Sequence, residues 1–115
     1  MNIRNADLWF CLGWLLCYAG AGQTAEDGQL AAIKRLGELN GIALNCGAIE
    51  QTRRMKQALV VNLPKQKQLG ELFDYETNRS FLQFIQERKQ CPAAVDLQQR
   101  VEEGIRQLEA VYADR

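Results

Sequence analysis

Four cysteines are the residues of this chain whose chemistry depends most on spacing. Cys11 and Cys17 lie in an apolar N-terminal segment, whereas Cys46 and Cys91 each lie where one helical pattern ends and the next begins. No C-x-x-C motif is present, so a thioredoxin-type redox site and c-type haem attachment both lack their sequence signature. If the N-terminal segment is removed on export, two cysteines remain, and we expect Cys46 and Cys91 to form one structural disulfide.

Other side chains that carry out catalysis or bind metals are scarce. The sequence has no histidine, which excludes Ser-His-Asp and Cys-His catalysis and removes the commonest ligand for zinc, copper and haem. The two cysteines that remain after removal of the N-terminal segment cannot supply a four-thiolate zinc site. No glycine-rich phosphate loop follows a strand. The carboxylates fall at helical spacings that are typical of solvated surfaces. We therefore expect a protein that is not an enzyme and that has no cofactor and no metal site.

Fourteen basic and fourteen acidic residues give a net charge of zero, so no overall field draws the chain toward nucleic acid. One basic cluster nevertheless stands out, and two interpretations of it remain open. It is either a candidate anion-binding patch or a solvated group of which the last two members complement a helix C-terminus. This cluster consists of Arg53, Arg54, Lys56, Lys65 and Lys67.

Residues 1–21 have the pattern of a secretory signal peptide. Arg4 gives a weakly positive start that Asp7 offsets, Leu8–Ala21 is a continuous apolar run, and the run ends in small residues suited to cleavage. We predict cleavage after Ala21, with Gly22 as the next candidate. The alternative is a membrane anchor, but fourteen helical residues span only about 21 Å of the ~30 Å hydrocarbon core. The exported protein should therefore have no stable membrane span and should be periplasmic or secreted.

Residues 22–115 show the apolar periodicity of a single helical domain, with helices predicted over about 26–45, 48–63, 65–89 and 92–113. Gly47 suits a left-handed C-cap, Pro64 should end the second helix, and Pro92 suits the first turn of the fourth. The stripes expected to face inward in the first, second and fourth helices are Leu30, Ile33, Leu36, Ala43 and Leu44, then Ile49, Thr52, Met55, Leu59 and Leu63, then Leu97, Val101, Ile105, Leu108 and Tyr112.

The first helix contains two glycines, Gly37 and Gly41, that weaken its interior. Asn40-Gly41 could end the helix in a turn, or glycines four residues apart could let another helix approach closely. We favour a continuous helix to about Asn45.

The third helix is the most apolar, and we expect its broad face to be core rather than a ligand site. Tyr75 and Leu82, seven residues apart, point away from that face and form a candidate contact surface. The residues of the broad face are Leu69, Leu72, Phe73, Phe81, Phe84 and Ile85.

Short connections favour antiparallel neighbours, and this topology places Cys46 and Cys91 at the same end of the molecule. The sequence therefore predicts an all-α fold, a small four-helix antiparallel bundle stapled by one disulfide. We expect a small exported, non-enzymatic interaction or accessory protein whose partner is another envelope protein. Another possibility is a subunit of an envelope complex.

The chain also resembles, in its layout, the acid-stress chaperones of enteric bacteria. The resemblance lies in size, export signal, helical content and one long-range cysteine pair, and no residue motif or functional residue accompanies it. It implies a periplasmic protein that exposes apolar helix faces at low pH.

Overall fold

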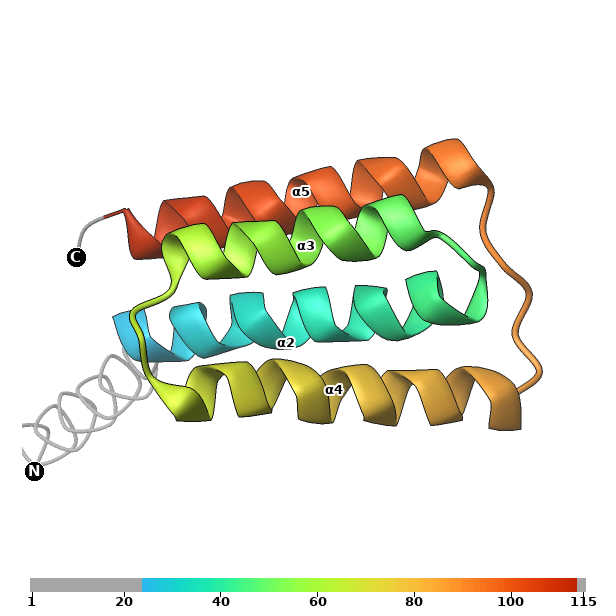
Figure 1. The fold of residues 1–115 in the computed structure, drawn as a ribbon, viewed down its shortest axis with the longest axis horizontal. Helices are drawn as coiled ribbons and strands as arrows, with labels where there is room; N and C mark the ends of the chain where they lie inside the picture. The colour runs from blue at the N-terminus through green and yellow to red at the C-terminus, as the bar shows by residue number, and fades with distance from the viewer. Residues whose placement is uncertain (1–23, 114–115) are drawn as a thin grey trace, which may run out of the picture.

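The structure is a computed structural model that describes residues 24–113. It contains four α-helices, α2 (Ala25–Asn45), α3 (Ile49–Asn62), α4 (Lys67–Gln86) and α5 (Ala94–Tyr112), and no strand occurs in this range. Successive helices run antiparallel (Figure 1). The prediction of a small all-α bundle of four antiparallel helices with one disulfide is therefore confirmed. The predicted signal peptide, residues 1–21, lies outside the described residues.

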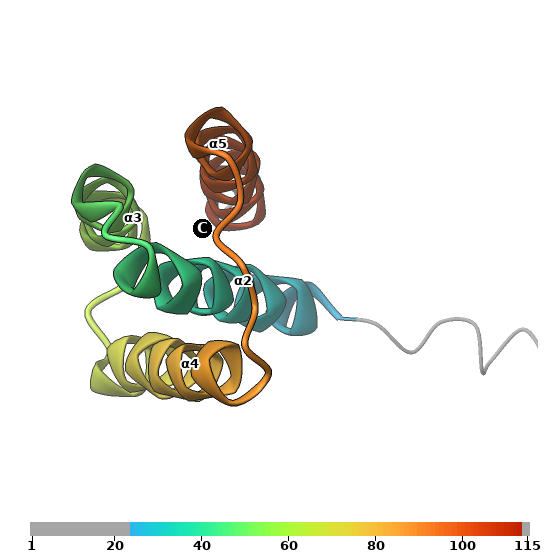
Figure 2. The same ribbon diagram turned by 90° about the vertical axis from the view of Figure 1, so that its right-hand side faces the viewer.

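Helix α2 is the central element of the fold. It packs against each of the other three helices, whereas α4 packs against α2 alone and α3 packs against α2 and α5. Figure 2 shows the resulting layers, with α4 on one side of α2 and with α3 and α5 on the other. A helix in this position must bury two faces, and α2 does so with different residue types on each.

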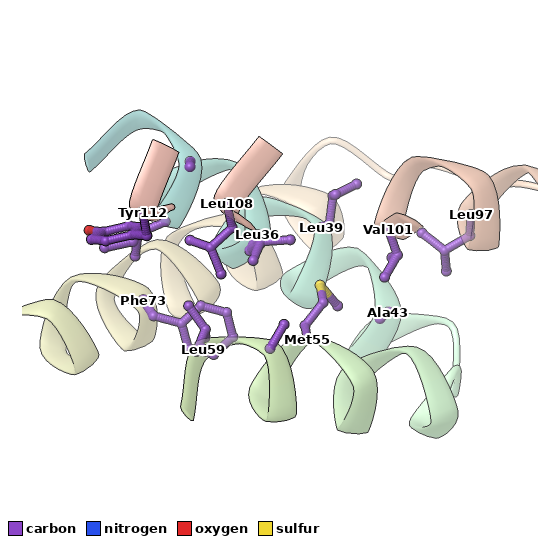
Figure 3. Packing of buried hydrophobic residues seen from close by; sticks show 13 residues of the cluster. Leu36, Leu39, Ala43, Met55, Leu59, Phe73, Leu97, Val101, Leu108 and Tyr112 are labelled. Carbon is purple, nitrogen blue, oxygen red and sulfur yellow. The ribbon is translucent and has the colours of Figure 1, made fainter. Parts of the chain in front are cut away.

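One face of α2 contributes to the apolar core, which lies between α2, α3 and α5 (Figure 3). Fully burying a side chain such as Leu or Ile stabilises a fold by roughly 1.5–3 kcal/mol. This core is therefore the main apolar contribution to the stability of the fold. Helix α4 adds a single buried hydrophobic residue, Phe73. The other buried hydrophobic residues are Ala32, Ile33, Leu36, Leu39, Ala43, Met55, Ala58, Leu59, Leu97, Val101, Leu108 and Tyr112.

The other face of α2 uses glycine to meet α4. A Cβ atom added at Gly37 would lie 2.6 Å from Glu76 Cβ, and one added at Gly41 would lie 2.6 Å from the backbone nitrogen of Phe81. Helix α2 continues unbroken to Asn45 through both positions. The favoured prediction of a continuous helix therefore holds, and the glycines serve the close approach of a second helix rather than a turn.

The ends of α2 and α4 share one backbone motif. After α2, Ala48 N donates to Ala43 O (2.8 Å) and Gly47 has φ 68°, the left-handed C-cap that the sequence predicts. After α4, Lys89 N donates to Phe84 O (3.1 Å) and Arg88 has φ 50°. This left-handed Arg88 is why α4 ends at Gln86 instead of continuing to residue 89 as predicted.

The other helix ends differ from the predicted bounds by one or two residues. Helix α2 begins after Thr24, whose side chain accepts a hydrogen bond from Asp27 N in a capping box. Pro64 ends α3 as expected, but the chain stays non-helical until Lys67. Pro92 lies two residues before α5 instead of in its first turn, because residues 89–93 are needed to cross from α4 to α5.

The predicted inward faces are correct for most positions and wrong for three. Leu44, Ile49 and Ile85 are exposed, and Phe81 and Phe84 are only half-buried. The reason is the layered arrangement, in which α4 has a single neighbour and can bury only one narrow strip. That strip is centred on small and polar side chains, so most of the aromatic stripe lies at its margin.

Candidate functional site

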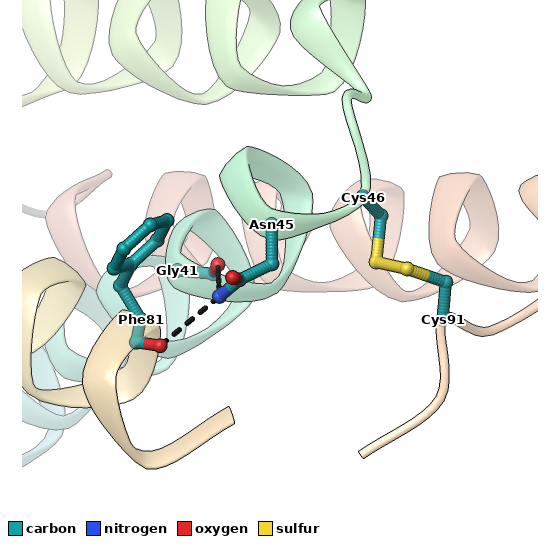
Figure 4. The surroundings of a disulfide bond; sticks show 5 residues. All are labelled: Gly41, Asn45, Cys46, Phe81 and Cys91. Atoms are coloured by element: carbon teal, nitrogen blue, oxygen red, sulfur yellow. Dashed lines mark hydrogen bonds between the residues drawn. A yellow bond between two sulfur atoms is a disulfide. The ribbon is translucent and has the colours of Figure 1, made fainter. Parts of the chain in front are cut away.

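The predicted disulfide joins Cys46, at the C-cap of α2, to Cys91, in the connection between α4 and α5 (Figure 4). The two Cα atoms are 5.7 Å apart, and the bonded residues are 45 positions apart in the sequence. Closing a loop of this length stabilises a fold by about 4 kcal/mol in the chain-entropy model. A disulfide of this kind points to an oxidising environment.

Hydrogen bonds reinforce the same end of the bundle. Asn45 Nδ2 donates to Gly41 O at 3.0 Å and to Phe81 O at 3.1 Å, which ties the last turn of α2 to α4 beside the disulfide (Figure 4). Gln83 Nε2 donates to Glu87 Oε2 at 2.8 Å, and this hydrogen bond, together with Lys89, lowers the pKa of Glu87. These hydrogen bonds lie at the end of the bundle that the cystine joins, where Cys46 is half-buried and Cys91 is exposed.

A buried polar network runs through the contact of α2 with α3 and α4. Asn40 is 2% exposed; its Nδ2 donates to Thr77 Oγ1 at 3.3 Å, and its Oδ1 accepts from Thr52 Oγ1 at 2.7 Å. Ser80 Oγ donates to the Glu38 carbonyl at 2.7 Å. No buried side-chain nitrogen or oxygen of the described chain lacks a partner. The network is thus fully satisfied and is typical of a structural contact.

Sequence reasoning missed this network. The spacing of small and polar residues could have revealed it. Gly37, Asn40 and Gly41 lie on one side of α2, and a strip of small and polar residues also lies on α4. Glu76 belongs to that strip and is 8% exposed, with Arg79 donating to it from Nε and Nη2. The apolar stripe of α4 is the stronger pattern in the sequence, and the polar strip lies beside it.

The candidate contact surface lies where the sequence places it, on the side of α4 away from α2. Tyr75 is 63% exposed and Leu82 is 56% exposed, and Ile85, predicted to be buried, extends the same surface at 53%. We call these three residues the outer face of α4. They form a stripe of large apolar side chains on the helix that has the fewest neighbours in the bundle.

The candidate anion-binding patch is not assembled into one site. Arg53 pairs with Glu50 at 2.7 Å on the outer side of α3, whereas Arg54 turns toward α5 and reaches Glu102 at 3.6 Å. The remaining members, Lys56, Lys65 and Lys67, enter no salt bridge within the described residues. The structure therefore divides the five residues between two sides of α3, the turn that follows it and the first residue of α4.

That turn carries an open groove of about 400 Å³ between the end of α3 and the start of α4. Aliphatic side chains form much of its lining, Lys65 and Lys67 contribute the charge, and no acidic residue lines it. The lining residues are Leu59, Val60, Leu63, Pro64, Lys65, Gln66, Lys67 and Gly70.

Within residues 24–113, no three acidic or cysteine side chains gather in a way that could hold a metal ion. None of the four helices is both long enough and apolar enough to cross a bilayer.

In comparisons with known proteins, no family model matches this chain, and no match was found among curated proteins or among solved structures.

Proposed function

We propose that this chain is a small exported, non-enzymatic helical protein that acts by binding another protein of the cell envelope. The observation that carries this proposal is the outer face of α4, where Tyr75, Leu82 and Ile85 are all more than half exposed. Large apolar side chains exposed along one side of a helix can serve as an interaction site, and tyrosine is among the residues enriched at interfaces. Among residues 24–113, α4 packs against α2 alone, so no other described helix covers this face.

The oxidising environment that the disulfide indicates supports the same proposal. The Cys46–Cys91 disulfide suits an oxidising compartment, and the sequence begins with the pattern of a secretory signal. A periplasmic protein of this kind would act as an accessory factor or as a subunit of an envelope complex. Its disulfide and its glycine-packed α2–α4 contact would keep the outer face of α4 in a fixed orientation.

The experiment compares proteins that co-purify with the tagged, exported chain and with two double variants. Tyr75→Glu with Leu82→Glu disrupts the outer face of α4, whereas Gln98→Glu with Gln107→Glu adds the same charge on exposed positions of α5. We expect one protein at near-stoichiometric amounts with the wild type and the α5 variant, and its loss with the α4 variant. The same set of proteins with all three chains would contradict the proposal.

A different observation favours a second candidate, an acid-stress chaperone. The contact that holds α4 on α2 is built from glycines and hydrogen-bonded polar groups, with only Phe73 buried among the apolar residues of α4. Near pH 2 carboxylates are protonated, and basic side chains would repel one another almost unopposed. Release of α4 would then expose its aromatic residues while the disulfide keeps the chain tethered.

The chaperone candidate is tested by the aggregation of an acid-denatured client near pH 2 and at pH 7, with and without the protein. Protection in acid and none at pH 7 would favour it over the accessory function. Absence of protection at stoichiometric excess would exclude it.

A further inference from the structure

The outward side of α3 carries a second surface with a regular spacing. Ile49, Arg53, Lys56, Val60 and Leu63 follow one another at intervals of four, three, four and three residues. Ile49 is 68% exposed and Val60 is 82% exposed, and Arg53 and Lys56 lie exposed between them. Leu63, at the C-cap of α3, is half-buried and lines the groove before α4. We call these five residues the α3 seam.

The spacing of the seam is that of the a and d positions of a coiled coil. Residues at these intervals form a stripe along one side of a helix, and they face a partner helix wherever one is present. Within the described chain α3 packs against α2 and α5 only, and it uses its other side, with Met55 and Leu59, to do so. The α3 seam therefore has the register of a helix–helix contact, and no helix within residues 24–113 lies against it.

The charge of this region indicates what the missing helix carries. Residues 49–67 contain five basic side chains and a single acidic one, Glu50, so this segment has a net charge of +4 in a chain that is neutral overall. Glu50 pairs with Arg53, but both side chains are about two-thirds exposed (64% and 68%). Exposed pairs of this kind contribute little, so the guanidinium group remains available to a second carboxylate.

We propose that the α3 seam binds an acidic amphipathic helix of a protein partner. Carboxylates of that helix would lie opposite Arg53 and Lys56, with aliphatic side chains opposite Ile49 and Val60. One further apolar side chain would enter the groove beside Leu63, where Lys65 and Lys67 add positive charge. The partner is thus recognised by an apolar–acidic–acidic–apolar pattern at intervals of four, three and four residues.

The arrangement fits a protein helix better than an anionic membrane surface. Helices that lie in a membrane interface separate a continuous apolar face from a charged face. In the α3 seam the two cations lie in the middle of the stripe, between aliphatic residues. At a bilayer, burial of Ile49 and Val60 would carry the two cations toward the hydrocarbon. A helix with carboxylates at matching positions would pair with the cations and pack against the aliphatic residues.

The α3 seam is separate from the outer face of α4, because α3 and α4 do not pack against each other. The inference therefore goes beyond the proposed function. The variant Tyr75→Glu with Leu82→Glu should leave binding at the seam unchanged, so that either hypothesis can fail without the other.

The test uses the exported chain and two helical peptide probes of three heptads. The acidic probe has Leu, Glu, Glu and Leu at the seam-facing positions, and the basic probe has Lys in place of both Glu residues. We expect the wild type to bind the acidic probe at least about tenfold more tightly, a difference of about 1.4 kcal/mol. This preference should decrease as salt is added, because exposed charges are screened.

Charge reversal provides the decisive comparison. Arg53→Glu with Lys56→Glu should invert the preference, so that the variant binds the basic probe more tightly. Arg100→Glu with Arg106→Glu changes the net charge equally on exposed positions of α5 and should keep the wild-type preference. Circular dichroism would verify that both variants are folded.

Three outcomes would overturn the inference. The first is equal affinity of the wild type for the two probes, and the second is inversion by the α5 variant as well, which would indicate overall charge alone. The third is binding to phosphatidylglycerol vesicles with no preference between the probes, which would assign the surface to a membrane.

Discussion

Gly41 of α2 lies directly against the backbone of Phe81 in α4, and a Cβ atom at position 41 would lie 2.6 Å from the Phe81 nitrogen. The same added atom would lie 2.6 Å from the side chain of Ser80. Two helices can come this close only where one of them has no side chain. This contact, repeated one turn earlier at Gly37, sets the distance between the central helix and the α4 layer and thereby fixes the orientation of the outer face of α4.

Replacing Gly41 by alanine should therefore destabilise the fold. We expect Gly41→Ala to lower the free energy of unfolding by about 1–3 kcal/mol, because the new methyl group meets backbone atoms that cannot move aside cheaply. Gly70→Ala is the matched control, since a Cβ there has no neighbour within 4 Å and alanine favours a helix by up to about 1 kcal/mol. Urea denaturation measures both variants, and equal stabilities would contradict the close-approach account.

The aromatic residues of α4 should differ in their contributions. Phe73 is 4% exposed, so Phe73→Ala should lower the free energy of unfolding by about 3–5 kcal/mol through transfer and cavity terms. Phe84 is only half-buried, so Phe84→Ala should cost clearly less. Thermal or urea unfolding of the two variants decides this, and a larger loss for Phe84→Ala would show that the packing of α4 differs from this description.

The left-handed residue after α4 offers a stabilising substitution. Arg88 has φ 50°, a conformation that costs an L-residue roughly 1–2 kcal/mol and costs glycine almost nothing. Arg88→Gly should therefore raise the free energy of unfolding by up to about 1 kcal/mol. Gly47→Ala, at the equivalent position after α2, should lower it. If both substitutions shifted stability in the same direction, the shared helix-end motif would not explain either.

Removing the disulfide should lower stability without changing the helix content. Cys46→Ser with Cys91→Ser is expected to lower the free energy of unfolding by about 2–5 kcal/mol, because the unfolded chain regains the freedom of a long loop. The wild type unfolded in the presence of a reductant should match the variant. An unfolding curve of the wild type that is unaffected by reductant would argue against the staple.

The sequence predicts the fold well wherever apolar periodicity decides burial. The stripe of α5 and the inward residues Met55 and Leu59 of α3 follow directly from helical spacing. The disulfide also follows, because antiparallel helices with short connections bring Cys46 and Cys91 to the same end. These inferences depend on local pattern and chain topology alone.

The position of α4 could not be predicted in the same way. Hydrophobic content identifies Phe81, Phe84 and Ile85 as a core stripe, but the buried strip is centred on Glu76, Thr77 and Ser80. Which stripe faces inward depends on the helix opposite, where glycines let the backbone of α4 approach closely. That complementarity is a property of two helices together, and the periodicity of either one does not contain it.

The most direct test of the proposed function is position-specific photo-crosslinking in living cells at neutral pH. A photoreactive residue is placed at Tyr75, on the outer face of α4, or at Gln107, an exposed control position on α5. If the outer face of α4 binds a protein partner, the probe at position 75 will give one crosslinked adduct of defined mass and the probe at position 107 will not. No adduct from position 75, or the same adducts from both positions, would contradict the account.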